Sequence, residues 1–391
     1  MKINPLLIIL TLGILTAIGS ISIDIYLPAF GAMAGYFNVP IVQIEATVTV
    51  FLFGMSLGQL LIGPMSDVWG RKTPLRIGLA VYIICSICCI LTSSFLLFLV
   101  LRFVQGLAGS ACQVISRALV SDIYKHKNAA HAFSVLQIIM GISPILSPMA
   151  GGMLAGEATW KYLFLIMAIV SGIGLAGCLT VLPAGKPATN DKKLHLSVLL
   201  KNYSYCIKHP AFVNYALVRA ISNSAAFSFV TASPFVLIQI YGLSEKQFGF
   251  VFSGLALGII ITGILNTKLL KHFEVQKIAK FAIACQLITG LMMVITLHLH
   301  GPFLVLLASI FIFISMLGLI LPNTTSLYIG AIPSFSGSAS ALVGAISYLS
   351  AFLITSALGL LYNQTAYPMI LMMWFCAVLA YWCLQYKIRD F

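Results

Sequence analysis

The stretch that decides the fold is residues 54–76, GMSLGQLLIGPMSDVWGRKTPLR, in which an apolar helical run enters a turn containing glycine and proline and then a group of positive charges. The same arrangement recurs 200 residues later in the chain. The matching pairs are Gly54 with Gly254, Gly58 with Gly258, Arg71 with Lys271, and Lys72 with His272. Repeated hydrophobic segments are typical of secondary transporters, whose substrate site lies between the two repeats. The sequence therefore predicts two related halves.

The composition places most of the chain inside a membrane. Of its 391 residues, 60% are hydrophobic and only 8% are charged, whereas a water-soluble globular domain carries about 25% charged residues. A membrane-spanning helix needs about 20 mostly apolar residues. We expect an all-α membrane protein with twelve transmembrane helices in two pseudo-symmetric six-helix bundles. The expected helices span residues 5–36, 42–64, 75–93, 95–121, 129–153, 160–182, 210–235, 246–268, 277–298, 302–328, 337–361 and 366–386.

The net charge of +13 is explained by the positions of the basic residues. With the helices placed as above, 18 of the 22 Lys and Arg residues fall on one side of the membrane, and only Lys161 and Lys246 fall on the other. Because basic residues concentrate in cytoplasmic loops, both termini are predicted to lie in the cytoplasm. The apolar run after Lys2 is longer than a signal-peptide core, so we expect it to stay as the first helix. The expected partner is the lipid bilayer, with no nucleic acid.

The nine cysteines lie almost entirely within the predicted helices, and Cys206 lies in the central loop. They are interpreted as small apolar residues and not as a disulfide framework. No His or carboxylate lies near the cysteines of residues 85–89 on their helix, and His298 and His300 are too few to hold a metal. We expect no metal and no cofactor.

The first predicted helix carries an acidic residue, Asp24. An acid near the bilayer centre costs about 2.5–3.5 kcal/mol on insertion scales, so it should face a watery cavity or a partner. Thr16, Ser20 and Asp24 are four residues apart and therefore share one face of a helix. The alternative is a carboxylate at the outer membrane edge, because the sequence does not fix the end of this helix.

The turn at residues 63–72 combines a conformational signal with charge. Gly70 permits a backbone conformation that other residues resist, and Asp67 can pair with Arg71 or accept hydrogen bonds from helix N-termini. The segment resembles the loop between the second and third helices of the major facilitator superfamily, Gly-x-x-x-Asp-x-x-Gly-Arg-Lys, with Val68 at the usual position of a basic residue. The resemblance implies the major facilitator fold and a place for these residues in a cytoplasmic conformational gate.

The fourth predicted helix contains a second costly charge, Arg102. The residues that share its face are Gln105, Gly109, Gln113 and Ser116. The segment resembles the family's fourth-helix motif, whose arginine is associated with proton coupling. We therefore expect Asp24 and Arg102 to serve in proton coupling, with Arg102 influencing the protonation of Asp24. The alternative is an arginine that extends to the outer membrane edge.

The fifth predicted helix is rich in residues that kink helices and let neighbours approach closely, namely Pro144, Pro148, Gly151 and Gly152. The pattern is similar to the antiporter motif of the superfamily's export branch, with Ser147 where that motif usually has glycine. The resemblance implies that these four residues belong to the conformational gate. Together, the patterns at residues 24–28, 102–106, 115–118 and 144–152 resemble the Bcr/CflA-type drug exporters.

Residues 183–209 form the longest polar interval. They are predicted to be a cytoplasmic linker between an N-terminal bundle, residues 1–182, and a C-terminal bundle, residues 210–391. Leu196, Leu199, Leu200 and Tyr203 are spaced to form a short helix against the inner leaflet.

Polar and aromatic residues of the second half are candidates for a substrate cavity. Arg219, Ser222 and Asn223 share a helix face, and several aromatic residues suit amphipathic ligands. In membrane helices, aromatic residues also serve as packing or interface anchors, which is the alternative. The predicted cavity residues of both halves are Ser20, Gln105, Gln113, Arg219, Asn223, Phe227, Phe235 and Tyr348.

These features favour a monomeric proton-coupled antiporter that exports small amphipathic compounds, such as drugs, siderophores or metabolites, by alternating access of the two bundles. No ATP-binding loop of the form Gly-x4-Gly-Lys-Ser/Thr occurs, so the chain is not itself an ATP-driven pump. Neither paired intramembrane carboxylates nor His-Glu-x-x-His occurs, so we do not expect an enzyme. The alternative is a proton-coupled symporter or facilitator that imports a polar small molecule.

Overall fold

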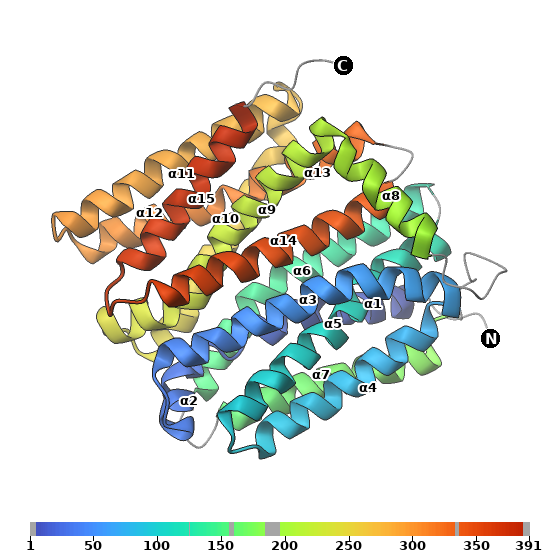
Figure 1. The fold of residues 1–391 in the computed structure, drawn as a ribbon, viewed down its shortest axis with the longest axis horizontal. Coiled ribbons are helices and arrows are strands. Elements are labelled where there is room, and N and C mark those ends of the chain that lie inside the picture. The colour runs from blue at the N-terminus through green and yellow to red at the C-terminus, as the bar shows by residue number, and fades with distance from the viewer. Residues whose placement is uncertain (1–4, 125, 156–159, 184–195, 333–335, 386–391) are drawn as a thin grey trace. The chain divides into compact units, whose positions relative to one another are not determined.

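A computed structural model describes residues 5–124, 126–155, 160–183, 196–332 and 336–385 (Figure 1). These residues are almost entirely helical. The elements of the first half are α1 (Pro5–Asp24), η1 (Leu27–Ala29), α2 (Phe30–Phe37), α3 (Ile41–Trp69), α4 (Lys72–Leu91), α5 (Phe95–Ile123), α6 (His126–Leu154) and α7 (Trp160–Thr180). Those of the second half are α8 (Leu196–Lys208), α9 (Pro210–Ser233), η2 (Pro234–Ile240), α10 (Glu245–Leu269), α11 (Val275–His298), α12 (Phe303–Ser315), α13 (Leu317–Ala331), α14 (Ser336–Leu360) and α15 (Tyr367–Gln385).

The prediction of twelve transmembrane helices is confirmed, because the described part of the chain contains 12 helical spans long and apolar enough to cross a membrane. Three of these spans are built from more than one segment. They are Leu6–Phe37, made of α1, η1 and α2; Pro210–Ile240, made of α9 and η2; and Phe303–Ala331, made of α12 and α13.

Proline accounts for two of these interruptions. It lacks a backbone N–H and its ring clashes with the preceding turn of a helix. Pro28 lies in the 3₁₀ segment η1, and Pro234 begins η2, which has the wider π-helical geometry. In the third span, α12 and α13 meet at Met316, and Pro322 lies within α13.

The chain divides into two compact units, Met1–Leu196 and Ser197–Phe391. The dividing point lies within residues 183–209, the interval predicted to link the two bundles. Of that interval, residues 184–195 lie outside the described residues, and most of the remainder forms α8. The expectation that Cys206 lies in a loop is wrong, because it lies in α8 and is fully buried.

In the first unit, α5 packs against α3 and α4, α4 packs against α7, and α1 packs against α6 (Figure 1). The contact between α3 and α5 depends on glycine residues, which have no side chain. A Cβ atom at Gly54 would collide with the backbone of α5 at Phe103, and one at Gly106 would collide with the backbone of α3 at Phe51. Small residues of this kind let membrane helices approach closely.

The two halves repeat this glycine pattern only in part. Gly58 and Gly258 have similar surroundings, since a Cβ atom on either would meet a serine hydroxyl of a neighbouring helix, Ser110 or Ser315. Gly54 and Gly254 differ, because Gly54 lies against α5 and nothing lies within 4 Å of a Cβ atom at Gly254. The repeated glycines therefore lie on corresponding helices of the two halves, but only some of them make corresponding contacts.

In the second unit, α9 packs against α13, α14 and α15, and α11 packs against α12, α13 and α15. Buried amides join some of these helices. Asn323 of α13 donates to Asn266 of α10 at 2.7 Å, and Gln286 of α11 donates to the carbonyl of Phe313 at 3.1 Å. Within a bilayer such interhelical hydrogen bonds satisfy groups that lipid cannot.

Many large apolar side chains are exposed on the outer helices, including Ile84, Ile169, Phe281 and Leu304. A water-soluble protein rarely exposes apolar surface on this scale. The exposed side chains are therefore suited to contact with lipid, in agreement with the hydropathy of the spans.

We predict that Gly54→Ala lowers the thermal stability of the purified protein in detergent. The added methyl group overpacks the contact between α3 and α5, which costs about 1–3 kcal/mol. Gly172→Ala is the matched control, because nothing lies within 4 Å of a Cβ atom at that position of α7. Equal melting temperatures for Gly54→Ala and the unchanged protein would contradict the close approach of the two helices.

Candidate functional site

Arg102 of α5 is completely buried and contacts several elements of the first unit. Its Nη1 donates to Gln105 Oε1, and its Nη2 donates to the carbonyl oxygen of Ser22 at 2.8 Å. The guanidinium carbon also lies 4.5 Å from the ring centre of Tyr26 and 4.6 Å from that of Phe51. A carbonyl, an amide and aromatic faces therefore surround the positive charge, and its Nε is buried without a hydrogen-bond partner among the described residues.

The end of α1 explains the role of the Ser22 carbonyl. The last four carbonyls of a helix have no partner within that helix, and Ser22 belongs to the last turn of α1. A cation is also favoured at a helix C-terminus by the helix dipole. Arg102 thus caps α1 where the helix stops.

A second layer of hydrogen bonds holds this arrangement. Gln105 donates from Nε2 to Ser86 Oγ of α4 at 2.7 Å, and Ser86 donates to the carbonyl of Tyr82 at 2.9 Å. The hydroxyls of Tyr82 and Ser22 are hydrogen-bonded, and the Tyr26 hydroxyl lies 2.8 Å from that of Thr47. Gln105, predicted to line a cavity, is instead fully buried within this network.

Asp24 is the last residue of α1 and is only 6% exposed. Among the described residues, the ion pairs involve Arg71, Asp67, Asp122, Lys277 and Glu274, and Asp24 is in none of them. The structure therefore does not pair Asp24 with Arg102. Thr16 on the same face is buried and donates to the carbonyl of Gly13, and Ser20 is half-buried.

The proline- and glycine-rich helix α6 packs against the break that follows Asp24. A Cβ atom at Gly151 would collide with the carbonyl of Ile25, the residue next to Asp24, and would lie 3.3 Å from Pro28. Pro144 and Pro148 lie within α6, and Gly152 is buried beside Gly151. The sequence placed these residues in a gate, and the structure brings Gly151 to the backbone beside the buried acid.

Gln113 occupies a separate polar position on α5. It accepts a hydrogen bond from Gln59 of α3 at 3.2 Å. Its Nε2 would lie 2.6 Å from a Cβ atom at Gly19 of α1, so only a glycine leaves room there. Gln59 and Gln113 thus form a buried amide pair near α1.

In the second unit, Arg219 of α9 donates to the carbonyl of Leu321 at 2.6 Å and to Thr325 Oγ1 at 2.8 Å. Both partners lie on α13, on either side of Pro322. Asn223 lies one turn further along α9 and is half-buried. The arginine therefore ties α9 to the proline-containing helix.

The predicted aromatic residues form two groups. Phe227 of α9 and Tyr348 of α14 have ring centres 6.3 Å apart. Phe235 of η2 packs instead against Tyr362, with ring centres 5.0 Å apart. The structure brings Phe227 and Tyr348 together and separates Phe235 from this pair.

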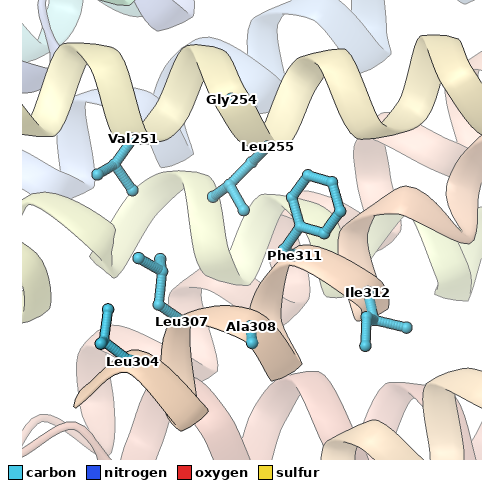
Figure 2. Close-up of a pocket in the computed structure, with 8 residues that line it drawn as sticks. All are labelled: Val251, Gly254, Leu255, Leu304, Leu307, Ala308, Phe311 and Ile312. Carbon is cyan, nitrogen blue, oxygen red and sulfur yellow. The ribbon is translucent and has the colours of Figure 1, made fainter.

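A groove of about 520 Å³ lies between α10 and α12 in the second unit (Figure 2). Its lining residues are Val251, Gly254, Leu255, Leu304, Leu307, Ala308, Phe311 and Ile312. None of the predicted site residues lines it, and it offers no polar side chain that could orient a ligand. It does not serve as the candidate site.

Two of the predicted gate residues, Asp67 and Arg71, form a charge cluster with Asp122 at the end of α3. Arg71 pairs with Asp67, and its Nε donates to Asp122 of α5 at 2.9 Å. The expected helix end at residue 64 is wrong, because α3 continues through Pro64 to Trp69 and Asp67 lies in its last turn. Gly70 then has φ +79°, a conformation that favours glycine.

The surroundings of Arg71 keep it charged. Burial lowers the pKa of the guanidinium, but the hydrogen bonds and negative charges of Asp122 and Asp67 outweigh burial and raise this pKa above its ordinary value. In the second half, the matching residues Lys271 and His272 are both exposed. Neither is bound to an acid in the ion pairs of the described residues. The cluster is thus a feature of the first unit.

Three residues that were not predicted as site residues stand out in the structure: Asp122, Gln59 and Glu45. Asp122 completes the Arg71 cluster but lies beyond the predicted end of its helix. Gln59 pairs with Gln113, and Glu45 of α3 is an acid that is only 4% exposed. The cost of an intramembrane acid, which drew attention to Asp24, was a signal for Glu45 as well.

We predict that Asp122→Asn loosens the turn between α3 and α4. A partly exposed ion pair contributes up to about 1 kcal/mol, so amide hydrogen exchange at residues 66–76 should become up to about fivefold faster. Glu274→Gln is the control, because it removes an exposed ion pair of similar type with Lys277. Unchanged exchange at residues 66–76 in Asp122→Asn would show that Asp122 does not hold the turn.

Comparison with known proteins places this architecture in a family. The sequence pattern described as Major Facilitator Superfamily matches residues 12–384. The chain is 30% identical to the uncharacterized MFS-type transporter YdgK of Bacillus subtilis, over 94% of this chain and 92% of that protein. It is 28% identical to a bicyclomycin resistance protein homolog of Haemophilus influenzae, over 96% and 95% of the two chains.

A solved structure agrees with the fold. The crystal structure of a D-xylose-proton symporter matches with a TM-score of 0.76 over 98% of both chains, at 14% sequence identity. At this identity the likeness concerns the fold alone. With the twelve spans and the match across nearly the whole sequence, the chain belongs to the major facilitator superfamily, a family of multi-pass membrane transporters.

Proposed function

We propose that this protein is a Bcr/CflA-type antiporter that exports small amphipathic compounds from the cytoplasm in exchange for protons. Membership of the major facilitator superfamily and the similarity to a bicyclomycin resistance protein homolog support export of drug-like compounds. Proton coupling is typical of the family. The transporter class also favours a protein that is not an enzyme.

The observation that carries the proposal is the position of Asp24. Its carboxyl is buried at the break between α1 and η1 and lies in none of the described ion pairs. A charged carboxylate left without a partner in a membrane interior is costly, so its protonation depends on what surrounds it. Asp24 is suited to take up a proton in one conformation and release it in another.

The packing of α6 supplies a link between this proton and a conformational change. Because Gly151 touches the backbone beside Asp24, a movement of α6 alters the surroundings of the carboxyl directly. Arg102 acts on the other side of the break by holding the Ser22 carbonyl. In this proposal Arg102 positions the end of α1 and does not neutralise Asp24 through an ion pair.

The proposal extends to ligand binding and gating. Ser20 and Gln113 in the first unit, with Asn223, Phe227 and Tyr348 in the second, remain candidate cavity residues. The Arg71 cluster remains the candidate cytoplasmic gate, since an arginine bound by two acids resists separation of α3 from α5. We place the protein in the cytoplasmic membrane, with both termini in the cytoplasm, and as a monomer.

We expect Asp24→Asn to abolish proton-driven efflux while leaving membrane insertion intact. The amide cannot carry the coupling proton. The measurement is proton release from purified protein in detergent when ethidium is added, followed as pH is varied. Glu274→Gln is the control, because this side chain is 72% exposed and distant in sequence from the proposed site. Ethidium-induced proton release that persists unchanged in Asp24→Asn would place the coupling proton elsewhere.

The direction of transport separates the proposal from its alternative. In proteoliposomes with opposite imposed proton gradients, an antiporter moves ethidium against the direction of proton flow. A symporter moves its substrate with the protons, and a facilitator shows no dependence on the gradient. Substrate movement in the same direction as protons would favour the importer.

We predict opposite sidedness for two engineered cysteines. Ser204→Cys on α8 should react with a membrane-impermeant maleimide only from the cytoplasm, and His300→Cys only from outside, because basic residues concentrate on the side of α8. Both positions are exposed, and the unchanged protein with its nine native cysteines measures background labelling. Labelling with the reverse sidedness would overturn the topology.

A further inference from the structure

Glu45 is a second buried acid that the proton-coupling proposal does not use. It lies in the second turn of α3 and is only 4% exposed. Its Oε1 atom is buried without a hydrogen-bond partner, and Glu45 is absent from the ion pairs of the described residues. This carboxyl group thus lies inside a membrane span, and no basic residue of the described part of the chain forms an ion pair with it.

Two basic residues in the helices of the first unit, Arg102 of α5 and Lys161 of α7, have other partners. Arg102 is held by Gln105, the Ser22 carbonyl and aromatic rings. Lys161 donates to the Tyr36 hydroxyl at 3.1 Å and lies 4.5 Å from the centre of that ring. A buried carboxylate needs either a proton or a cation, and the ion pairs of the described residues supply no cation for Glu45.

Glu45 is part of a polar face of α3. At 100° per residue, Thr49, Ser56 and Gln59 all lie within about 40° of Glu45 around the helix. All four side chains are buried, with exposures of 4%, 7%, 2% and 3% for Glu45, Thr49, Ser56 and Gln59. Among these four, Glu45 is the ionisable residue, and an ionisable residue inside a membrane span is a candidate functional site.

The face reaches α5 at one end, where Gln59 is hydrogen-bonded to Gln113, whereas Glu45 lies at the other end. Gly54 lies nine residues after Glu45, which places it about 180° away around the helix. Because Gly54 lies against the backbone of α5 at Phe103, Glu45 lies on the opposite side of α3 from this contact. It is therefore not required for this close approach of α3 to α5.

The polar face leads toward the candidate cavity residues. Gln59 at its inner end is hydrogen-bonded to Gln113, which lies against Gly19 of α1. Fourteen residues separate Glu45 from Gln59, a distance of about 21 Å along a helix. The face thus runs from one end of the membrane span to the polar residues near its middle.

We propose that Glu45 forms a binding subsite for the positively charged group of a monovalent organic cation. The subsite lies at the end of α3 that the proposed topology places outside. It deepens the proposed function by naming cationic amphipathic compounds as a substrate class, and it rests on that function for its physiological meaning. Glu45 supplies the negative charge at the N-terminal end of α3. The polar face of α3 extends from Glu45 to the Gln59–Gln113 pair and offers further polar contacts to the ligand.

The test is equilibrium binding to purified protein in detergent, with tetraphenylphosphonium as the cationic probe and chloramphenicol as a neutral one. Glu45→Gln should weaken tetraphenylphosphonium binding by about tenfold or more, because a close charge pair is lost. Chloramphenicol binding should change less than twofold. Glu274→Gln is the matched control, since it removes an exposed acid.

A second measurement does not depend on the folding of a variant. A hydrophobic carbodiimide should modify Glu45 in the unchanged protein, and tetraphenylphosphonium should protect it while chloramphenicol does not, as read by mass spectrometry of the modified peptide. The proposal is overturned if tetraphenylphosphonium does not bind, if it binds equally well to Glu45→Gln, or if it gives no protection.

The outcomes also separate this proposal from the proposed function. Binding is measured without a membrane or a proton gradient. Charge-dependent binding at Glu45 together with an absence of proton-driven efflux would reject only the antiport mechanism. Proton-driven efflux of ethidium that is unaffected by Glu45→Gln, with unchanged tetraphenylphosphonium binding, would reject only the cation subsite.

Discussion

The buried guanidinium of Arg102 is the interaction on which the rest of the first unit depends. A fully buried charge is tolerated only when its hydrogen-bonding groups and its field are compensated. The carbonyl at the end of α1 and the rings of Tyr26 and Phe51 contribute to this compensation, and none of these groups is an acid. Because the partners come from α1, α3 and α5, the arginine fixes the place where α1 stops. Asp24 lies at this same end of α1, two residues after the carbonyl that Arg102 binds, although the two side chains do not form an ion pair among the described residues.

Both intramembrane arginines follow the same principle. Arg102 and Arg219 each bind a backbone carbonyl of another helix together with a side-chain oxygen. In each case the carbonyl lies beside an irregularity, the end of α1 or Pro322 of α13. Lipid offers no hydrogen bonds, so polar groups near an irregular segment need protein partners. The arginines make such irregular segments possible inside the membrane.

The two units share helix order but differ in charge. The first contains Asp24, Glu45, Arg102 and the Arg71 cluster, whereas Arg219 is the charged residue that the structure shows bound between helices in the second. Aromatic pairs such as Phe227 with Tyr348 are the corresponding feature of the second unit. This asymmetry supports a division of roles in the proposed function, with protons and cations handled by the first unit and apolar ligand surface provided by the second.

The sequence by itself determined the membrane location, the twelve spans and the positions of the costly charges, because hydropathy and the energy of intramembrane charge depend on local composition. It also identified Arg71 and Gly70, since the turn needs a glycine with positive φ. Only the tertiary structure decided which groups meet. The bonds of Arg102 to the Ser22 carbonyl and of Arg71 to Asp122 join residues 80 and 51 positions apart, and no local pattern specifies them. That Glu45 is in none of the ion pairs of the described residues is likewise visible only in the structure, because a missing partner is a property of packing.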